Sequence, residues 1–228
     1  MILAAGRGER MRPLTDHTPK PLLEVGGRRL IEWHLAALAR AGFRDVVINH
    51  AWLGAQLPAT LGDGARYGLR LRYSDEGESA LETGGGIQGA ALAGSRALPG
   101  RQWRCLDRLH HARRPQLDAQ ALAALVLVPN PPQHPRGDFA LRSGPEGTDV
   151  VAEPDADAAR YTFSGIGVYR PEFFAGCEPG KFPLLPLFRR AAAAGRLRGQ
   201  LYQGLWFDIG TPQRLRELDE RLGAGAVG

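Results

Sequence analysis

The first 22 residues constrain this chain more than any other stretch. A short apolar run, Met1–Ala5, leads directly into a turn built on Gly6 and Gly8. The run is too short for a membrane span or for the apolar part of a secretory signal. Arg10 follows the turn, and Lys20 stands between two prolines. Glycines let backbone N–H groups approach an anion closely, and fixed cations neutralise its charge. The stretch therefore predicts a polyphosphate-binding turn, with a solvated basic turn after an edge strand as the alternative.

The spacing of this motif separates it from the commoner phosphate-binding loops. The P-loop requires G-x-x-x-x-G-K-[ST], and the dinucleotide-binding turn requires G-x-G-x-x-G. This stretch reads instead G-x-G-x-R-M-x-P-L-T, followed by P-K-P-L. The combination resembles the signature of the sugar-1-phosphate nucleotidyltransferases, which join a nucleoside triphosphate to a sugar 1-phosphate and release pyrophosphate.

Net charge does not favour nucleic acid as a partner. The chain of 228 residues carries a net +5, but residues 101–114 hold five arginines against one aspartate and so supply +4 of it. The remainder is almost neutral, whereas a nucleic-acid surface spreads its cations over a face or a helix. Two cysteines, Cys105 and Cys177, make no disulfide framework, and no run of eighteen apolar residues occurs. A cytoplasmic protein without a membrane segment or secretory signal is expected.

Helical and strand patterns alternate along the chain, which predicts an α/β fold. Apolar residues at helical spacing in 30–38 are followed by a β-branched run at 46–49, and this alternation continues. We expect a single domain with a doubly wound, mostly parallel, Rossmann-like sheet and a small antiparallel insertion. The patterns predict helices at 30–38, 53–61, 88–92, 171–174, 184–194 and 212–222, and strands at 46–49, 69–73, 125–128, 136–141, 150–152 and 161–169.

The resemblance covers residues 1–92 and the chain from residue 125 onward. It is greatest to the members that use UTP and N-acetylmuramate 1-phosphate in peptidoglycan recycling, because of the stretches 48–54, 81–87, 136–139 and 162–166. It implies a monomer, since the additional C-terminal domain of some relatives is not recognisable. It also implies catalytic roles for Arg10 and Lys20, nucleotide binding by Ala5, Gly6, Gly8, Asn49, Glu82, Gly84 and Gly85, and sugar binding by Gly137, Asp138, Thr162 and Gly165.

The glycine cluster at 84–86 and the carboxylate of Asp208 each allow a second interpretation. By resemblance, the residues Glu82 to Gly86 form a loop around the nucleobase, although three glycines before a helix also suit a flexible turn. By resemblance, Asp208 of the W-x-D-I-G-T motif is a Mg²⁺ ligand, and a hard carboxylate that bridges to phosphate oxygens suits that ion. The alternative for Asp208 is a residue of the helix N-cap region before Thr211.

Residues 98–115 depart from the family pattern. At this place the family has a buried strand that ends in N-G-D, whose aspartate is the first Mg²⁺ ligand. Arginine recurs every few residues here, which predicts no buried strand, and Arg104 stands at the position of the metal carboxylate. Asp107 and Asp118 are possible substitutes, but nothing in the sequence directs either toward the site.

A shift of the reading frame explains this departure. Codons for residues 102–105, read one nucleotide downstream, give Asn or Ser, then Gly, and then allow Asp. Codons for residues 97–102, read the same way, permit Pro-Phe-Leu-Val-Val, a strand that leads into N-G-D. Our hypothesis is a compensated frameshift over about residues 95–118, with a divergent loop as the alternative.

The consequence is a chain expected to fold poorly or to be nearly inactive, because a cation replaces a metal ligand and a polar segment replaces a core strand. Three other functions stay open. The same fold could use GTP and mannose 1-phosphate, or the chain could bind nucleotide sugars without catalysis. Nucleic-acid binding through the arginine-rich segment ranks last.

Overall fold

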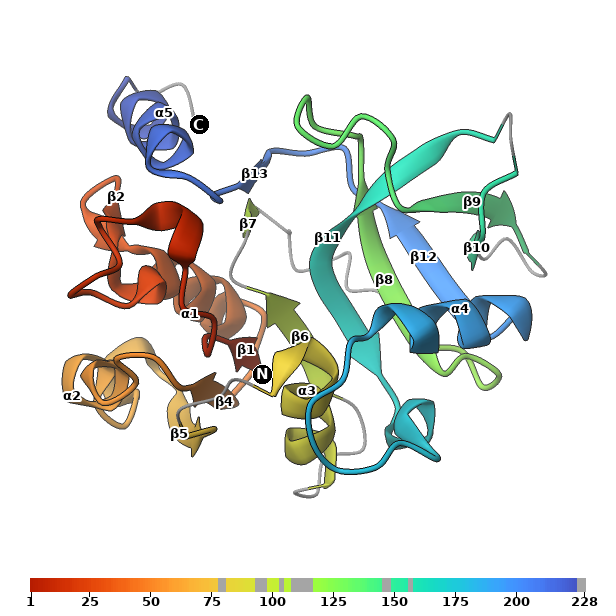
Figure 1. Ribbon diagram of the computed structural model, residues 1–228, viewed down its shortest axis with the longest axis horizontal. Helices are drawn as coiled ribbons and strands as arrows, with labels where there is room; N and C mark the ends of the chain where they lie inside the picture. Colours follow the sequence, from red (N-terminus) through yellow and green to blue (C-terminus); the bar gives the residue numbers. More distant parts are fainter. Residues whose placement is uncertain are drawn as a thin grey trace. The chain divides into compact units, whose positions relative to one another are not determined.

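The chain forms two compact units. The computed structural model describes residues 1–77, 81–92, 98–102, 105–107, 117–144, 149–155 and 158–224. The first unit comprises Met1–Ala80, Gln102–Ala112 and Leu205–Gly228, and the second comprises Leu81–Arg101 and Arg113–Gly204 (Figure 1). The two units are described in turn.

A parallel sheet organises the first unit. Its strands β1 (Ile2–Leu3), β4 (Asp45–His50) and β5 (Arg70–Asp75) lie in the order β5-β4-β1, with Ile2 opposite Ile48. Parallel strands need a crossover, and the helix α1 (Leu30–Arg40) supplies the one between β1 and β4. The carboxyl ends of β1 and β4 therefore lie at the same edge of the sheet, where the glycine turn begins.

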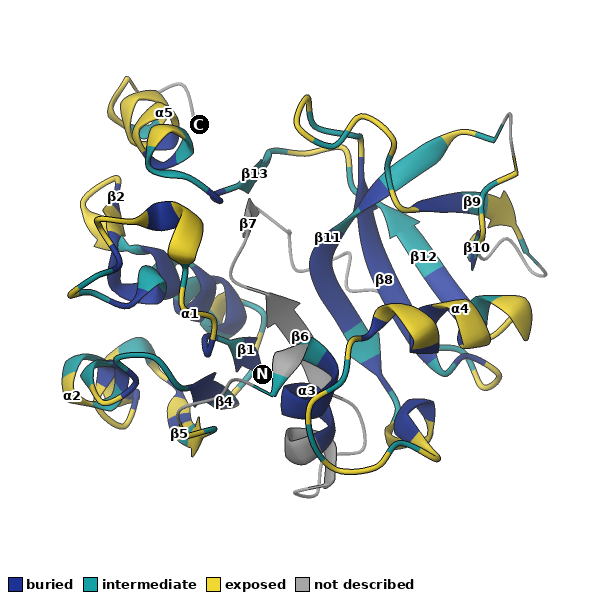
Figure 2. Ribbon diagram, in the orientation of Figure 1, coloured by how far each residue is buried: buried dark blue, intermediate teal, exposed yellow. Residues whose placement is uncertain are grey.

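The core of the first unit is completed by the end of the chain. Ile2, Ile31 and Leu35 are fully buried in it. Leu218 of α5 (Pro212–Gly223) is equally buried in the same cluster, because α5 places its apolar residues three and four apart on one face. Figure 2 shows the other side of α5 exposed. Two short antiparallel pairs join this unit, β2 (Glu24–Val25) with β3 (Arg28–Arg29), and β7 (Cys105–Asp107) with β13 (Trp206–Asp208).

The second unit contains a closed ring of five strands. Each neighbouring pair in the sequence β11-β8-β12-β10-β9 is hydrogen-bonded, and β9 also pairs with β11. A closed ring leaves no unpaired sheet edge among its members. The ring consists of β8 (Ala123–Val128), β9 (Phe139–Ser143), β10 (Asp149–Ala152), β11 (Arg160–Tyr169) and β12 (Leu197–Leu201), and β6 (Leu98–Gln102) adds to β11.

Aromatic side chains fill the space between this ring and its helices. The buried helix face of α4 (Leu185–Ala193) packs on β10 and β12. Its Phe188 ring lies 6.0 Å from that of Phe139 and 5.4 Å from that of Phe163, both edge to face. Figure 2 shows β8 and most of β11 buried. Phe173 of η6 (Pro171–Phe174) belongs to the same cluster, 5.8 Å from Phe188.

The predicted elements are largely confirmed, with two corrections. The sheet is parallel in the first unit, whereas most pairings in the second unit are antiparallel, because the predicted insertion strands close a ring. The predicted helix at 53–61 begins only at Gln56 in α2 (Gln56–Leu61), since Leu53 has a positive φ of 52°. Between residues 98 and 107 the backbone forms β6 and β7, and the prediction that no buried strand occurs there stays a prediction.

Backbone pairing explains why strands form in this arginine-rich segment. The pairs Arg101–Ile166 and Leu98–Tyr169 place β6 antiparallel to β11, and ladder hydrogen bonds do not depend on side-chain type. The burial of the β6 and β7 side chains lies outside the described part of the chain. No helix in the described ranges is long and apolar enough to cross a membrane. The remaining elements are η1 (Glu9–Met11), η2 (Lys20–Leu22), η3 (Ala65–Tyr67) and α3 (Glu82–Leu92).

Candidate functional site

The glycine turn after β1 is held in one conformation by its own hydrogen bonds. The Gly8 carbonyl accepts from the Met11 N–H at 2.8 Å and from the Thr15 hydroxyl at 2.9 Å. Gly8 has a φ of +70°, and an added Cβ would lie 3.1 Å from Thr15 Cγ2 and 3.4 Å from Lys20 Cβ. A side chain is disfavoured at Gly8 on both grounds. The turn thereby brings the predicted residues Gly8 and Lys20 together.

Gly6 has a different role from Gly8. It is exposed, and an added Cβ would meet no atom within 4 Å among the described residues beyond its two chain neighbours. The packing of the described residues therefore does not require a glycine here and leaves space beside its backbone for a ligand. Arg10, in η1, is also exposed. The first unit thus presents an accessible backbone at Gly6 with cationic side chains in the same turn, as the sequence predicts.

Trp52 supports the turn from the α2 side of the first unit. Its indole N–H donates to the Thr15 carbonyl at 3.1 Å, and the Arg7 guanidinium lies 4.4 Å from the centre of its ring. A guanidinium over an indole is a favourable cation–π contact. Trp52 was missed as a site residue. The only indication in the sequence is that Trp52 lies within 48–54, one of the stretches that carry the family resemblance.

Asn49 fixes the end of β1. It is 2% exposed, its side-chain oxygen accepts from the Ala4 N–H at 2.7 Å, and its amide nitrogen donates to Glu76 at 2.6 Å. Both ends of the amide are therefore bonded to protein. Because Ala4 precedes Ala5 and Gly6, Asn49 positions the backbone that enters the turn.

Asp208 lies at the end of β13, opposite Cys105 of β7. Its Oδ2 accepts from Arg214 Nη1 at 2.9 Å, while its Oδ1 is buried with no hydrogen-bond partner in the described part of the chain. A buried carboxylate oxygen without a partner is costly unless something binds it. Thr211, whose hydroxyl accepts from the Arg214 N–H at 3.3 Å, is the N-cap of α5. The role of capping α5, which was the alternative for Asp208, therefore belongs to Thr211.

The glycine cluster of the second unit is helical. The sequence predicts a loop from Glu82 to Gly86, but these residues lie within α3, so that prediction is wrong. An added Cβ at Gly84 would lie 2.4 Å from the Phe182 ring, and one at Gly85 would lie 2.0 Å from the Gly180 carbonyl oxygen. The Gly84 N–H donates to the Phe182 carbonyl at 3.0 Å. The glycines thus admit a neighbouring backbone, which offsets their low helix propensity. The Glu82 side chain lies outside the described residues.

The predicted sugar-binding residues of the second unit surround Asn130, which the sequence did not single out. The Thr162 hydroxyl donates to Asn130 Oδ1 at 2.9 Å. Gly137 has a φ of +60°, and an added Cβ would lie 2.5 Å from the same oxygen. Asp138 Oδ2 accepts from the Phe163 N–H at 2.8 Å. The structure therefore brings Gly137, Asp138 and Thr162 together at the end of β8.

Gly165 lies farther along β11, at a bulge. It has a φ of +87°, and the register of β11 against β8 shifts between Phe163 and Gly167. Ser164, which precedes it, is 1% exposed, and its hydroxyl accepts from the Ile166 N–H. A bulge re-aims the residues around it, which fits the predicted interruption of this strand by glycine.

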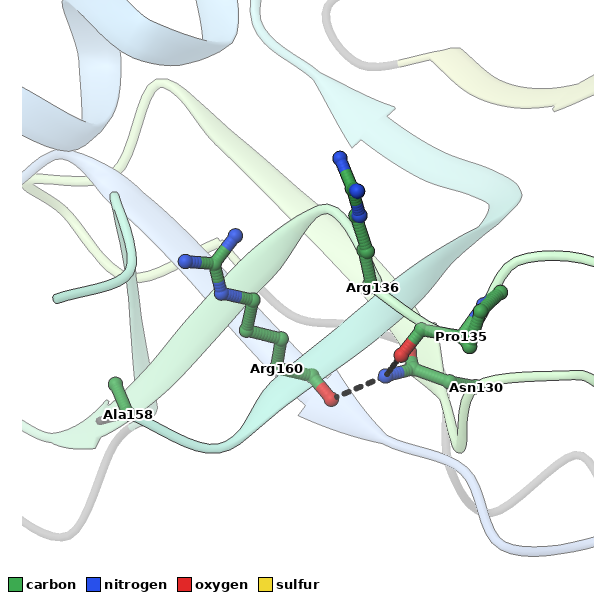
Figure 3. Close-up of a pocket in the computed structure, with 5 residues that line it drawn as sticks. All are labelled: Asn130, Pro135, Arg136, Ala158 and Arg160. Atoms are coloured by element: carbon green, nitrogen blue, oxygen red, sulfur yellow. Dashed lines mark hydrogen bonds between the residues drawn. The ribbon is translucent and has the colours of Figure 1, made fainter. Parts of the chain in front are cut away.

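A pocket of about 530 Å³ opens beside Asn130, lined by Asn130, Pro135, Arg136, Ala158 and Arg160 (Figure 3). The sequence did not predict it. The only signal was the rigid Pro129–Pro132 stretch at the end of β8, which places a fixed loop there. Its volume lies within the range of small-molecule sites.

The substitute metal ligands considered from the sequence are not supported at Asp118. Its carboxylate binds the buried Arg198 guanidinium and accepts from the Ala121 N–H at 2.8 Å. The Arg198 hydrogen bond lowers the pKa of Asp118 below its usual value. Arg104 and the Asp107 side chain lie outside the described residues. The described part of the chain contains no group of three or more His, Cys, Asp or Glu side chains that could hold a metal ion.

Comparisons with known proteins identify the family. A family described as "Nucleotidyl transferase" matches residues 1–100. The chain is 46% identical to "N-acetylmuramate alpha-1-phosphate uridylyltransferase" of Neisseria meningitidis serogroup B, covering 98% of both chains. It is 35% identical to the protein of the same name from Caulobacter vibrioides, covering 97% of this chain and 96% of the relative.

Solved structures agree on the fold. A Bacillus anthracis protein assigned as a glucose-1-phosphate thymidylyltransferase aligns with a TM-score of 0.75 at 19% identity, covering 97% of this chain and 93% of that one. The two relatives of 46% and 35% identity, matched along nearly the whole chain, define a nucleotidyltransferase. The chain belongs to the sugar-1-phosphate nucleotidyltransferase family, and its long matches include the N-acetylmuramate α-1-phosphate uridylyltransferases.

Proposed function

We propose that the protein transfers the uridylyl group of UTP to N-acetylmuramate 1-phosphate, giving UDP-N-acetylmuramate and pyrophosphate. The single observation that carries this is the 46% identity to a uridylyltransferase along 98% of both chains. The mannose-1-phosphate guanylyltransferase of Mycobacterium tuberculosis matches far less of the chain, 40%. UTP and N-acetylmuramate 1-phosphate are therefore preferred over GTP and mannose 1-phosphate.

In this reaction a phosphate oxygen of the sugar 1-phosphate bonds to the α-phosphorus of UTP, and the bond from that phosphorus to the bridging oxygen of the leaving pyrophosphate breaks. Such transfers depend on positioning and charge neutralisation, with little covalent work for the protein. The open backbone at Gly6 suits the approach of phosphate oxygens. Arg10 and Lys20 supply cations to the triphosphate, and Asn49 holds the entering backbone in place.

The metal implied by the family fits Asp208. Its buried Oδ1 has no partner in the described part of the chain, and Mg²⁺ takes one or two carboxylates together with phosphate oxygens. Bound Mg²⁺ would supply positive charge at the reacting phosphates. Arg214 orients the carboxylate through Oδ2 and leaves Oδ1 available.

The frameshift hypothesis concerns the second metal carboxylate. Arg104 in place of an aspartate predicts turnover well below that of relatives, and the shifted codons can encode N-G-D at residues 102–104. Sequencing the DNA over residues 95–118 tests this. A nucleotide sequence in which no one-base shift encodes N-G-D eliminates the hypothesis, and a frame-repaired chain with no gain in turnover does the same.

One assay distinguishes this function from its alternatives. The purified protein is given Mg²⁺, each of the four common nucleoside triphosphates and a panel of sugar 1-phosphates, and pyrophosphate release is measured. The highest kcat/KM is expected with UTP and N-acetylmuramate 1-phosphate. Nucleotide binding without pyrophosphate release, in both the present and the frame-repaired chain, would support a non-catalytic binding protein. Arg104 of the present chain is the observation that favours this alternative.

The proposal has four further parts. The two units act as one nucleotidyltransferase domain with a doubly wound sheet, the protein works as a monomer, it lies in the cytoplasm, and its product enters peptidoglycan recycling. These parts rest on the resemblance and on the relatives' names. Light scattering with and without UTP tests the monomer.

A further inference from the structure

The pocket beside Asn130 has an unusual balance of charge. Among the described residues, its lining contains the two cations Arg136 and Arg160 and no carboxylate. Neither guanidinium forms an ion pair or hydrogen bond within the part of the chain that the structure describes. Other arginines of the second unit, such as Arg142 and Arg189, are paired with acidic side chains. In Figure 3 both pocket guanidinium groups extend to the same side, away from the Asn130 hydrogen bonds.

A single side chain fixes the backbone that carries both arginines. Asn130 Nδ2 donates to the Pro135 carbonyl, directly before Arg136, at 3.2 Å, and to the carbonyl of Arg160 itself at 3.0 Å. Gly137, directly after Arg136, packs so closely on Asn130 that no Cβ fits. The two cations therefore project from a rigid frame, which lowers the conformational cost of binding an anion.

The same frame carries the predicted sugar-binding residues. Thr162 bonds to Asn130, and Gly137 contacts it, so the arginine pocket is continuous with them. N-acetylmuramate differs from N-acetylglucosamine by a lactyl ether that ends in a carboxylate, which is ionised at neutral pH. Guanidinium groups bind carboxylates through paired, charge-assisted hydrogen bonds.

We propose that Arg136 and Arg160 form a subsite for the carboxylate of the sugar substrate and select N-acetylmuramate 1-phosphate over sugar 1-phosphates that lack it. This inference rests on the proposed function and assigns its sugar specificity to two residues. The other anion on the substrate is the 1-phosphate, which every sugar 1-phosphate shares. Experiment can distinguish these two anions, because N-acetylglucosamine 1-phosphate carries the 1-phosphate but lacks the carboxylate.

Calorimetry on the full chain tests the proposal independently of turnover. The probes are N-acetylmuramate 1-phosphate and N-acetylglucosamine 1-phosphate, and the variants are Arg136→Gln and Arg160→Gln. Each substitution should weaken binding of the first probe by about 10- to 100-fold and leave the second nearly unchanged. Arg136→Lys and Arg160→Lys should recover part of the affinity, since the charge returns without the planar fork.

Arg189→Gln is the matched control, because it removes the same charge from an exposed ion pair of the same unit outside the pocket. It should change neither affinity. Equal weakening of both probes by the pocket variants would assign the arginines to the 1-phosphate and overturn the proposal. Unchanged affinities would also overturn it. If neither sugar phosphate binds to the unsubstituted chain or to the frame-repaired chain, the proposed function fails and the subsite with it.

Discussion

The substitution Gly85→Ala tests whether the glycine cluster serves packing or the nucleotide. In the interior of a helix, alanine is normally more stable than glycine by about 0.5–1 kcal/mol. In α3, however, the new Cβ would lie 2.0 Å from the Gly180 carbonyl oxygen, whereas real Cβ contacts stay beyond 3.0 Å. The backbone near residue 180 must therefore move by about an ångström, which also strains the hydrogen bond from Gly84 to Phe182.

Overpacking of this kind costs about 1–3 kcal/mol, so the gain from helix propensity should be reversed and the free energy of unfolding should fall by about 1–2 kcal/mol. For a chain of this size each kcal/mol corresponds to about 2–4 °C, so we expect Tm to fall by about 2–8 °C. Thermal unfolding followed by circular dichroism gives the measurement. Gly223→Ala is the control, because an added Cβ at the end of α5 would meet none of the neighbouring described residues within 4 Å, and its Tm should stay constant or rise slightly.

Two outcomes would refute this reasoning. A Tm at or above that of the unsubstituted protein would show that the close approach to Gly180 does not exist. An unchanged Tm with a Kd for UTP raised about tenfold or more would show that Gly85 serves the nucleotide, as the resemblance implies, and not the packing of α3.

Three further substitutions test other parts of the structure. Asp208→Asn should lower kcat of the frame-repaired chain by about 10²–10³-fold at saturating Mg²⁺ with little change in Tm, and an unchanged kcat would remove Asp208 from the metal site. Asp118→Asn should reduce stability at neutral pH by about 1–2 kcal/mol, because Arg198 loses a charged partner. Since the pKa of Asp118 is lowered in the folded protein, this stabilisation is present above its unfolded pKa and is lost as pH falls through its folded pKa. Urea unfolding of both proteins from pH 7 downward should therefore show the difference between them shrink in acid, and a constant difference would contradict the assignment. Thr211→Ala should lower the free energy of unfolding by about 1 kcal/mol in the same urea experiment, because α5 loses its N-cap. An unchanged free energy would show that this cap contributes nothing.

Sequence patterns predicted the elements whose residues interact with near neighbours in the chain or are all buried. Apolar residues at helical spacing predicted α1, and an unbroken apolar run predicted β8, whose residues are all buried. The glycine turn could also be predicted, because its residues bond to one another within about ten positions of the chain.

Elements that depend on distant partners could not be predicted. The helix α3 contains four glycines and is stabilised by a backbone almost a hundred residues away. β12 contains Arg198, which is buried because Asp118 lies eighty residues earlier in the chain. The arginine pocket was missed for the same reason, since Asn130, the residue that organises it, bonds to groups that only the ring of strands brings together.

The path of the chain between the two units sets a limit on how the protein can fold during synthesis. The second unit ends at Gly204, whereas the first needs the residues from Leu205 onward. Ile209, Leu215 and Leu218 lie in the same core as Ile2 and are 2%, 8% and 0% exposed. On the ribosome, the glycine turn therefore emerges before the whole second unit, but the unit that holds it can complete its core only after α5 has followed. The second unit has all of its residues available before the first unit does.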